Sequence, residues 1–167
     1  MKQALDSLQR SVIVVVFVVL VICVSWQVIT RYILGVPSTI TDEIARFLFI
    51  WLALLGGAYT YGQGRHLAID TIARSLTGRN RLIVEACITV LVAAFAACVL
   101  VWGGLQLVFQ TLSAGQISPS LRIPMGYVYC AVPISGVVIL CYAVSQLITL
   151  ARGRLPDAIT QDVPPVE

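Results

Sequence analysis

The sequence predicts an all-α integral membrane protein with four transmembrane helices. Of its 167 residues, 59% are hydrophobic and only 11% are charged, whereas charged residues make up about 25% of an ordinary soluble domain. The apolar residues fall into four long uncharged runs separated by short polar stretches. A helix needs about 20 apolar residues to cross the hydrocarbon core, so runs of this length are typical of spanning helices. A transmembrane β-barrel would instead show alternating segments of about 10 residues.

The runs indicate one membrane domain over residues 1–154, followed by a flexible cytoplasmic tail over residues 155–167. The expected spans cover approximately residues 11–33, 42–63, 82–110 and 124–151. The second run is the shortest, so its helix must bring Arg46 close to the membrane edge. The fourth contains Pro133, which deprives the Tyr129 carbonyl of its usual helical donor and predicts a kink.

Lysine and arginine residues are concentrated on one side of the predicted spans. Eight of the eleven flank one side, and only Arg31, Arg46 and Arg122 flank the other. Cytoplasmic connections carry the excess of positive charge in membrane proteins. The count therefore predicts that both termini, and the connection between the second and third spans, are cytoplasmic.

That connection predicts a short amphipathic helix over about residues 67–77, lying in the membrane interface. Its apolar positions recur at the spacing of one helical face: Ile69, Ile72, Ala73 and Leu76. Its basic residues would face anionic phospholipid headgroups: Arg65, Arg74, Arg79 and Arg81. His66 and Asp70 fit either a polar turn that starts this helix or a proton relay.

The second span carries the residues most indicative of a partner. On a helical wheel with about 100° per residue, one face collects Glu43, Arg46, Ile50, Ala53 and Gly57. The small-x-x-x-small spacing of Ala53 and Gly57 lets a neighbouring helix approach closely. We predict that this face, together with Asp42, contacts another protein; packing within the four helices is the alternative. Glu43 and Arg46 can pair with each other or across to a partner helix.

The sequence shows no catalytic, cofactor-binding or metal-binding constellation, so it predicts neither an enzyme nor a cofactor. A single histidine, His66, excludes bis-histidine haem ligation within this chain. The five cysteines form no C-x-x-C pair and lie in apolar runs, which favours buried packing residues over a metal or redox site. The net charge of +3 is explained by the cytoplasmic bias and requires no nucleic-acid partner.

Four segments, in order, carry a resemblance to a known family. They are Arg31–Tyr32 after the first span, Asp42–Trp51 followed by Leu55–Ala58 in the second, Gly64–Asp70 after it, and Ile123–Tyr127 at the start of the fourth. Together they resemble the small membrane subunit, of DctQ type, of tripartite ATP-independent periplasmic (TRAP) transporters. Asp42 stands where the family often has a second glutamate, and it keeps the negative charge.

The resemblance implies a place in a sodium-coupled secondary transporter of the bacterial inner membrane. Such transporters take up organic acids, of C4-dicarboxylate or sialic acid type, from a periplasmic substrate-binding protein. A large membrane subunit carries the substrate and sodium sites and is thought to move like an elevator, and the small subunit packs beside it as scaffold. With both termini cytoplasmic, two connections face the periplasm: residues 32–41 and residues 111–122, which include Ser118 and Arg122. The resemblance implies that they help to dock the substrate-binding protein; the alternative is that they are simply short turns.

Three other functions remain open on the residues alone. A self-contained proton-coupled transporter would need an essential membrane acid, for which Glu85 is the deepest candidate. A four-span redox enzyme lacks its cysteine pair. A membrane anchor for another complex is the third alternative.

Overall fold

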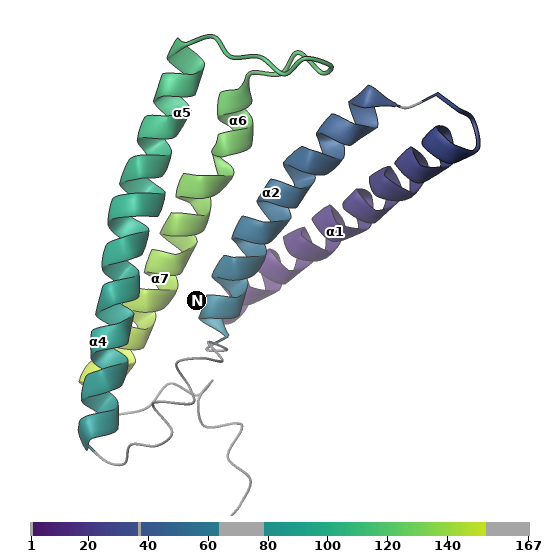
Figure 1. The fold of residues 1–167 in the computed structure, drawn as a ribbon. Helices are drawn as coiled ribbons and strands as arrows, with labels where there is room; N and C mark the ends of the chain where they lie inside the picture. Colours follow the sequence, from purple (N-terminus) through teal and green to yellow (C-terminus); the bar gives the residue numbers. More distant parts are fainter. Residues whose placement is uncertain (1, 37, 64–78, 153–167) are drawn as a thin grey trace, which may run out of the picture.

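The computed structural model describes residues 2–36, 38–63 and 79–152, and these residues are almost entirely helical (Figure 1). Four helical segments in them are long and apolar enough to cross a membrane: Asp6–Tyr32, Thr39–Gly62, Leu82–Ser113 and Met125–Ala151. The prediction of an all-α membrane protein with four spans is therefore confirmed. The interfacial helix expected over residues 67–77 and the tail expected over residues 155–167 lie outside the described residues.

The first two spans are single helices, whereas the third and fourth are each composite. In chain order the elements are α1 (Lys2–Tyr32), α2 (Thr39–Gly62), α4 (Arg79–Phe95), a π-helix η1 (Ala96–Gly103), α5 (Gly104–Ser113), α6 (Met125–Tyr129) and α7 (Ala131–Ala151). The third span is the continuous run of α4, η1 and α5, and the fourth is α6 followed by α7. The helix of the first span therefore extends well before residue 11, where the apolar run begins.

The four spans alternate in direction, so the start of α1 and the end of α7 lie at the same end of the molecule (Figure 1). α7 is the central helix and contacts α2, α4, η1, α5 and α6. α1 packs mainly along α2, on the side away from the third span. None of the apolar window of α1 is buried within the chain. The described protein is thus a three-span core with one peripheral helix.

The third and fourth spans are distorted where they pack together. The fourth helix is interrupted between Tyr129 and Ala131, four to two residues before Pro133, whose missing N–H leaves the Tyr129 carbonyl without its donor. Gly104, at the junction of η1 and α5, lies directly against Pro133: a Cβ on this glycine would come within 3.0 Å of the proline ring. The wide turns of the π-helix therefore stand opposite the point where the fourth span is interrupted. The kink predicted from the sequence stays a prediction.

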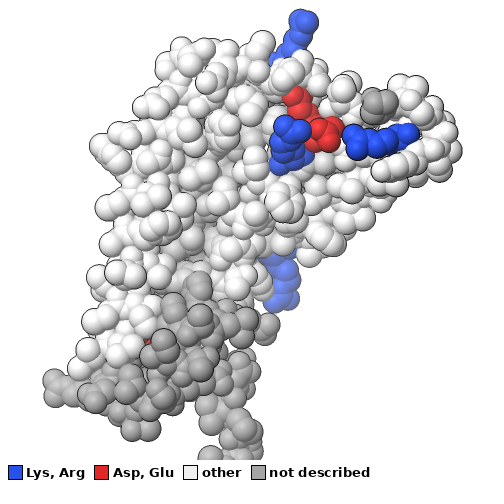
Figure 2. Space-filling model, in the orientation of Figure 1, with Lys and Arg blue, Asp and Glu red and all other residues white. Residues whose placement is uncertain are grey.

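Large apolar side chains cover the outside of the helices. Examples are Ile22 (63% exposed), Leu91 (73%) and Trp102 (67%), an exposure that a soluble surface could not sustain. On the face shown in Figure 2, charged side chains gather mainly near the end that carries the α1–α2 connection, and a broad uncharged surface lies between the ends. Contrary to the expectation of buried packing cysteines, Cys87, Cys98 and Cys141 are exposed. Lipid is as apolar as a protein core, so a small apolar side chain can face either.

Candidate interaction sites on the membrane helices

A buried carboxylate of α2 holds the connection between α5 and α6. Glu43 is only 7% exposed, and its Oε2 atom accepts three hydrogen bonds from the turn formed by residues 118–122. The Ser118 hydroxyl donates at 2.5 Å, the Ser120 backbone N–H at 3.1 Å and the Leu121 N–H at 2.9 Å. Charge-assisted bonds of this kind are about twice as strong as neutral ones. Glu43 therefore ties the start of α2 to a connection that lies 75 residues further along the sequence.

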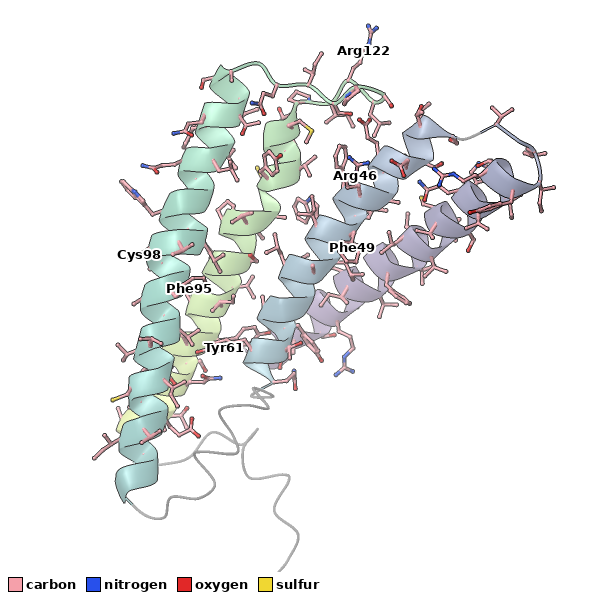
Figure 3. All side chains as sticks on the ribbon, in the orientation of Figure 1. Arg46, Phe49, Tyr61, Phe95, Cys98 and Arg122 are labelled. Atoms are coloured by element: carbon pink, nitrogen blue, oxygen red, sulfur yellow. The ribbon has the colours of Figure 1, made fainter. Side chains whose placement is uncertain are left out.

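The backbone donors of the 118–122 turn are all engaged. The Ser118 N–H donates to the Ile123 carbonyl at 2.9 Å, and the Arg122 N–H donates to the Ser118 carbonyl at 3.1 Å. Pro119 has no N–H to satisfy, and the two remaining donors bind Glu43. Because unpaired backbone groups are costly away from water, the carboxylate completes the turn. Arg122 then takes a left-handed backbone conformation, with φ of 53°, and its side chain points away from the helices (Figure 3).

A cavity of about 400 Å³ opens between the end of α1, the start of α2 and this turn. Its lining includes the following residues: Arg31, Ser38, Thr39, Asp42, Glu43, Arg46, Pro119 and Ser120. Asp42 pairs with Arg46 one helical turn later at 2.9 Å and accepts a bond from the Gln27 amide at 3.0 Å. Both members of the ion pair are more than half exposed, so the pair contributes little to stability.

The structure corrects two expectations about these residues. Arg46 pairs with Asp42, and Glu43 binds the 118–122 turn; the sequence had suggested a pair between Glu43 and Arg46 or across to a partner. Ser118, expected to contact a docking protein, is fully buried and serves to bind Glu43. The reason is the same in both cases: a helical wheel places residues on a face but does not show which loop covers that face. Arg122 and Arg46 are exposed, as docking or contact would require.

The rest of the predicted face of α2 is open within the described chain. Ala53 and Gly57 are exposed and Ile50 is half-buried. A Cβ built on Gly57 would meet nothing within 4 Å. By contrast, a Cβ on Gly62, five residues further along α2, would lie 2.5 Å from the Tyr142 ring. Small residues near the end of α2 serve internal packing, whereas Ala53 and Gly57 leave room that this part of the chain does not fill.

A second polar cluster, at the opposite end of the molecule, joins three helices. The Tyr142 hydroxyl of α7 bonds to the Asp6 carboxylate at 2.5 Å and to the Gln9 side-chain carbonyl at 2.9 Å, both on α1. The Gln9 amide donates to the Leu55 carbonyl of α2 at 3.0 Å. Tyr142 also packs with Tyr61, which projects from α2 toward α7 (Figure 3), in a small buried core. This cluster was not predicted, because Asp6 and Gln9 precede the first apolar run.

The remaining predicted residues divide between described and undescribed parts of the chain. Four of them lie outside the described residues: Arg65, His66, Asp70 and Arg74. Arg79 and Arg81 lie in α4, but their side chains are not described. Glu85 is buried on α4, 8% exposed. Within residues 2–36, 38–63 and 79–152, His, Cys, Asp and Glu side chains form no group of three that could hold a metal ion.

The match to a family model decides which protein class this architecture belongs to. The model of the family described as tripartite ATP-independent periplasmic transporters, DctQ component, matches residues 20–153, which include the Glu43 site, the 118–122 turn and the open face of α2. The chain belongs to the DctQ family. It is therefore a multi-pass membrane protein of a transporter family, as the resemblance seen in the sequence implied.

Individual relatives of the DctQ chain agree with the family model. A TRAP transporter small permease protein of Haemophilus influenzae is 28% identical over 128 residues, covering 77% of this chain and 78% of its own length. The C4-dicarboxylate TRAP transporter small permease protein DctQ of Rhodobacter capsulatus is 30% identical over 124 residues, covering 73% of this chain and 54% of its own length. The isethionate TRAP transporter permease protein DctMQ of Oleidesulfovibrio alaskensis is 27% identical over 135 residues, which are 77% of this chain but only 21% of that protein.

Proposed function

We propose that this chain is the small scaffold subunit of a sodium-coupled TRAP transporter for organic acids. It packs against a large, elevator-type transport subunit, stabilises it, and helps to dock a periplasmic substrate-binding protein. Membership of the DctQ family supports this role. The Oleidesulfovibrio relative supports it too. Its name, DctMQ, combines M with Q, and this chain matches only 21% of its length. The rest of that polypeptide leaves room for a large membrane subunit.

The open face of α2 is the observation that carries the partnership with a large subunit. We expect it to contact that subunit through Ala53 and Gly57, with Ile50 and the exposed Asp42–Arg46 pair beside them. In lipid there is no hydrophobic drive between helices, so association depends on close van der Waals contact, which small residues permit. An open small-residue face on an otherwise bulky apolar surface is suited to receive another helix.

Co-purification tests the partnership. The tagged chain, extracted in mild detergent together with the membrane proteins encoded beside it, should retain a large membrane protein in equal amount. Recovery of the chain alone, with the large protein expressed and intact in the same membranes, would contradict the proposal. It would leave a membrane anchor for another complex as the alternative.

The proposed orientation puts both termini in the cytoplasm and the 118–122 turn in the periplasm of an inner-membrane protein. The distribution of lysine and arginine supports it, and it would also place Arg65, Arg74, Arg79 and Arg81 at the anionic cytoplasmic phospholipid surface. Single cysteines at the exposed positions Arg122 and Arg152 test it in a background without native cysteines. An impermeant thiol reagent should label position 122 in intact cells and position 152 only after lysis, and the reverse pattern would overturn the orientation.

Docking of the substrate-binding protein is assigned to the turn that displays Arg122 and to the neighbouring cavity that Arg31 and Arg46 line. The exposed guanidinium of Arg122 is suited to bind a carboxylate of a soluble protein. We expect Arg122→Glu to weaken binding of the substrate-binding protein to the assembled transporter by at least tenfold, because attraction becomes like-charge repulsion. Binding unchanged by this reversal would remove Arg122 from the docking surface.

A further inference from the structure

The 118–122 turn presents Arg122 on a backbone that is fixed from inside the membrane domain. Arg122 has a φ of 53°, in the left-handed region that residues other than glycine seldom adopt. A non-glycine residue keeps such a conformation only when its surroundings over-determine it. Here the Arg122 N–H closes the turn onto the Ser118 carbonyl at 3.1 Å. The direction of the Arg122 side chain therefore depends on the turn staying closed.

Glu43 is the group that keeps the turn closed. One oxygen of this carboxylate receives the Ser118 hydroxyl and the N–H groups of Ser120 and Leu121. The Leu121 N–H also lies 3.3 Å from the Ser118 hydroxyl oxygen. Without Glu43, the Ser120 N–H would lose its acceptor and the Leu121 N–H would keep only this longer contact, so the turn would be held less firmly. Glu43 sits in the first turns of α2 and is only 7% exposed, and the carboxylate oxygen that binds the turn is already occupied, so we assign it no direct contact with a soluble partner.

We propose that Glu43 is a positioning residue for docking. Its buried carboxylate holds the 118–122 turn in one conformation, so that the exposed Arg122 guanidinium is already aimed at an acidic side chain of the substrate-binding protein. The proposal rests on the docking function of Arg122 stated above. Pre-ordering of the turn raises affinity because less conformational entropy is lost when the two proteins meet.

A double-mutant cycle in the assembled transporter tests this role. The four proteins are the parent, Glu43→Gln, Arg122→Gln and the double variant, each purified with the large subunit and placed in lipid nanodiscs. The measurements are the Kd for the purified substrate-binding protein and the melting temperature of the transporter. Glu43→Gln should weaken docking about three- to tenfold, because a neutral acceptor replaces a charged one in three hydrogen bonds. In the Arg122→Gln background, the same change should have little further effect on Kd.

The cycle separates positioning from simple destabilisation. A residue that only stabilised the fold would lower the melting temperature in both backgrounds and leave Kd unchanged, or change it equally in both. Asp6→Asn is the matched control: it neutralises an acid that also holds a hydroxyl, but at the opposite end of the molecule, and should lower the melting temperature without changing Kd. Ser118→Ala, which removes one of the three donors, should weaken docking less than Glu43→Gln does.

The outcomes also distinguish this proposal from the docking function on which it rests. If Arg122→Gln leaves Kd unchanged, Arg122 does not dock and both ideas fail. If Arg122→Gln weakens docking while Glu43→Gln does not, docking stands and the positioning role is overturned. Equal effects of Glu43→Gln in both backgrounds would likewise overturn it.

Discussion

Gly136 of α7 and Gly57 of α2 are both glycines of spanning helices, yet their surroundings are opposite. A Cβ on Gly136 would lie 2.7 Å from the Leu100 Cβ and 3.1 Å from the Val101 backbone nitrogen of η1. A Cβ on Gly57 would meet nothing within 4 Å. The comparison shows two uses of a missing side chain. At Gly136 two helices of this chain are already in contact, whereas at Gly57 a contact of the same kind is possible but not made by the described chain.

The largest loss of stability should follow from filling the closed site. Gly136→Ala adds a methyl group against a Cβ and a backbone atom, neither of which can rotate away, so α7 and η1 must move apart. Overpacking of this kind costs about 1–3 kcal/mol. The melting temperature of the purified chain in detergent measures it, with Gly57→Ala as the matched variant. Equal melting temperatures for the two would show that α7 and η1 are not in close contact.

The sequence predicted the four spans because the physical requirement is simple: lipid offers no partner for backbone groups, so long apolar runs must be helical. It could not assign the inner and outer faces. In water a helix shows its buried side by polarity, but in lipid both sides are apolar, and Gly136 and Gly57 look alike. The same limit applies to Glu43. The wheel placed it near Arg46, but its true partner, the 118–122 turn, is a long-range contact that no local pattern encodes.

A smaller loss is expected at the polar cluster that attaches the peripheral helix. Tyr142→Phe removes the hydroxyl that bonds to Asp6 and Gln9 and leaves the shape of the ring against Gly62 unchanged. Asp6 and Gln9 then lose the one hydroxyl proton that they share, and because Asp6 is only half-buried, water can replace part of the bond. The cost should therefore lie at the lower end, about 1 kcal/mol. Because α1 is held mainly by α2, we expect faster hydrogen exchange in the first turns of α1, together with a lower melting temperature. Tyr127→Phe, at a side chain that is 62% exposed, is the control and should change neither.

The smallest effect on the isolated chain, and the most informative, is expected at the open face. Gly57→Leu and Ala53→Leu add bulk where the described chain has no neighbour. The free energy of unfolding of the chain alone should therefore change by no more than about 0.5 kcal/mol, with a correspondingly small shift in its melting temperature. In the complex the same side chains would separate two helix backbones. The yield and melting temperature of the complex with the large subunit should therefore fall, and Gly57→Leu should lower them more than Gly57→Ala does.

The control for this prediction is Ala94→Leu, at an exposed alanine on α4, which gives the effect of added bulk elsewhere on the surface. If the isolated chain loses as much stability as the complex does, the face is packed within this chain. If all these variants resemble the parent, Ala53 and Gly57 face lipid, and the large subunit must bind another helix of this chain.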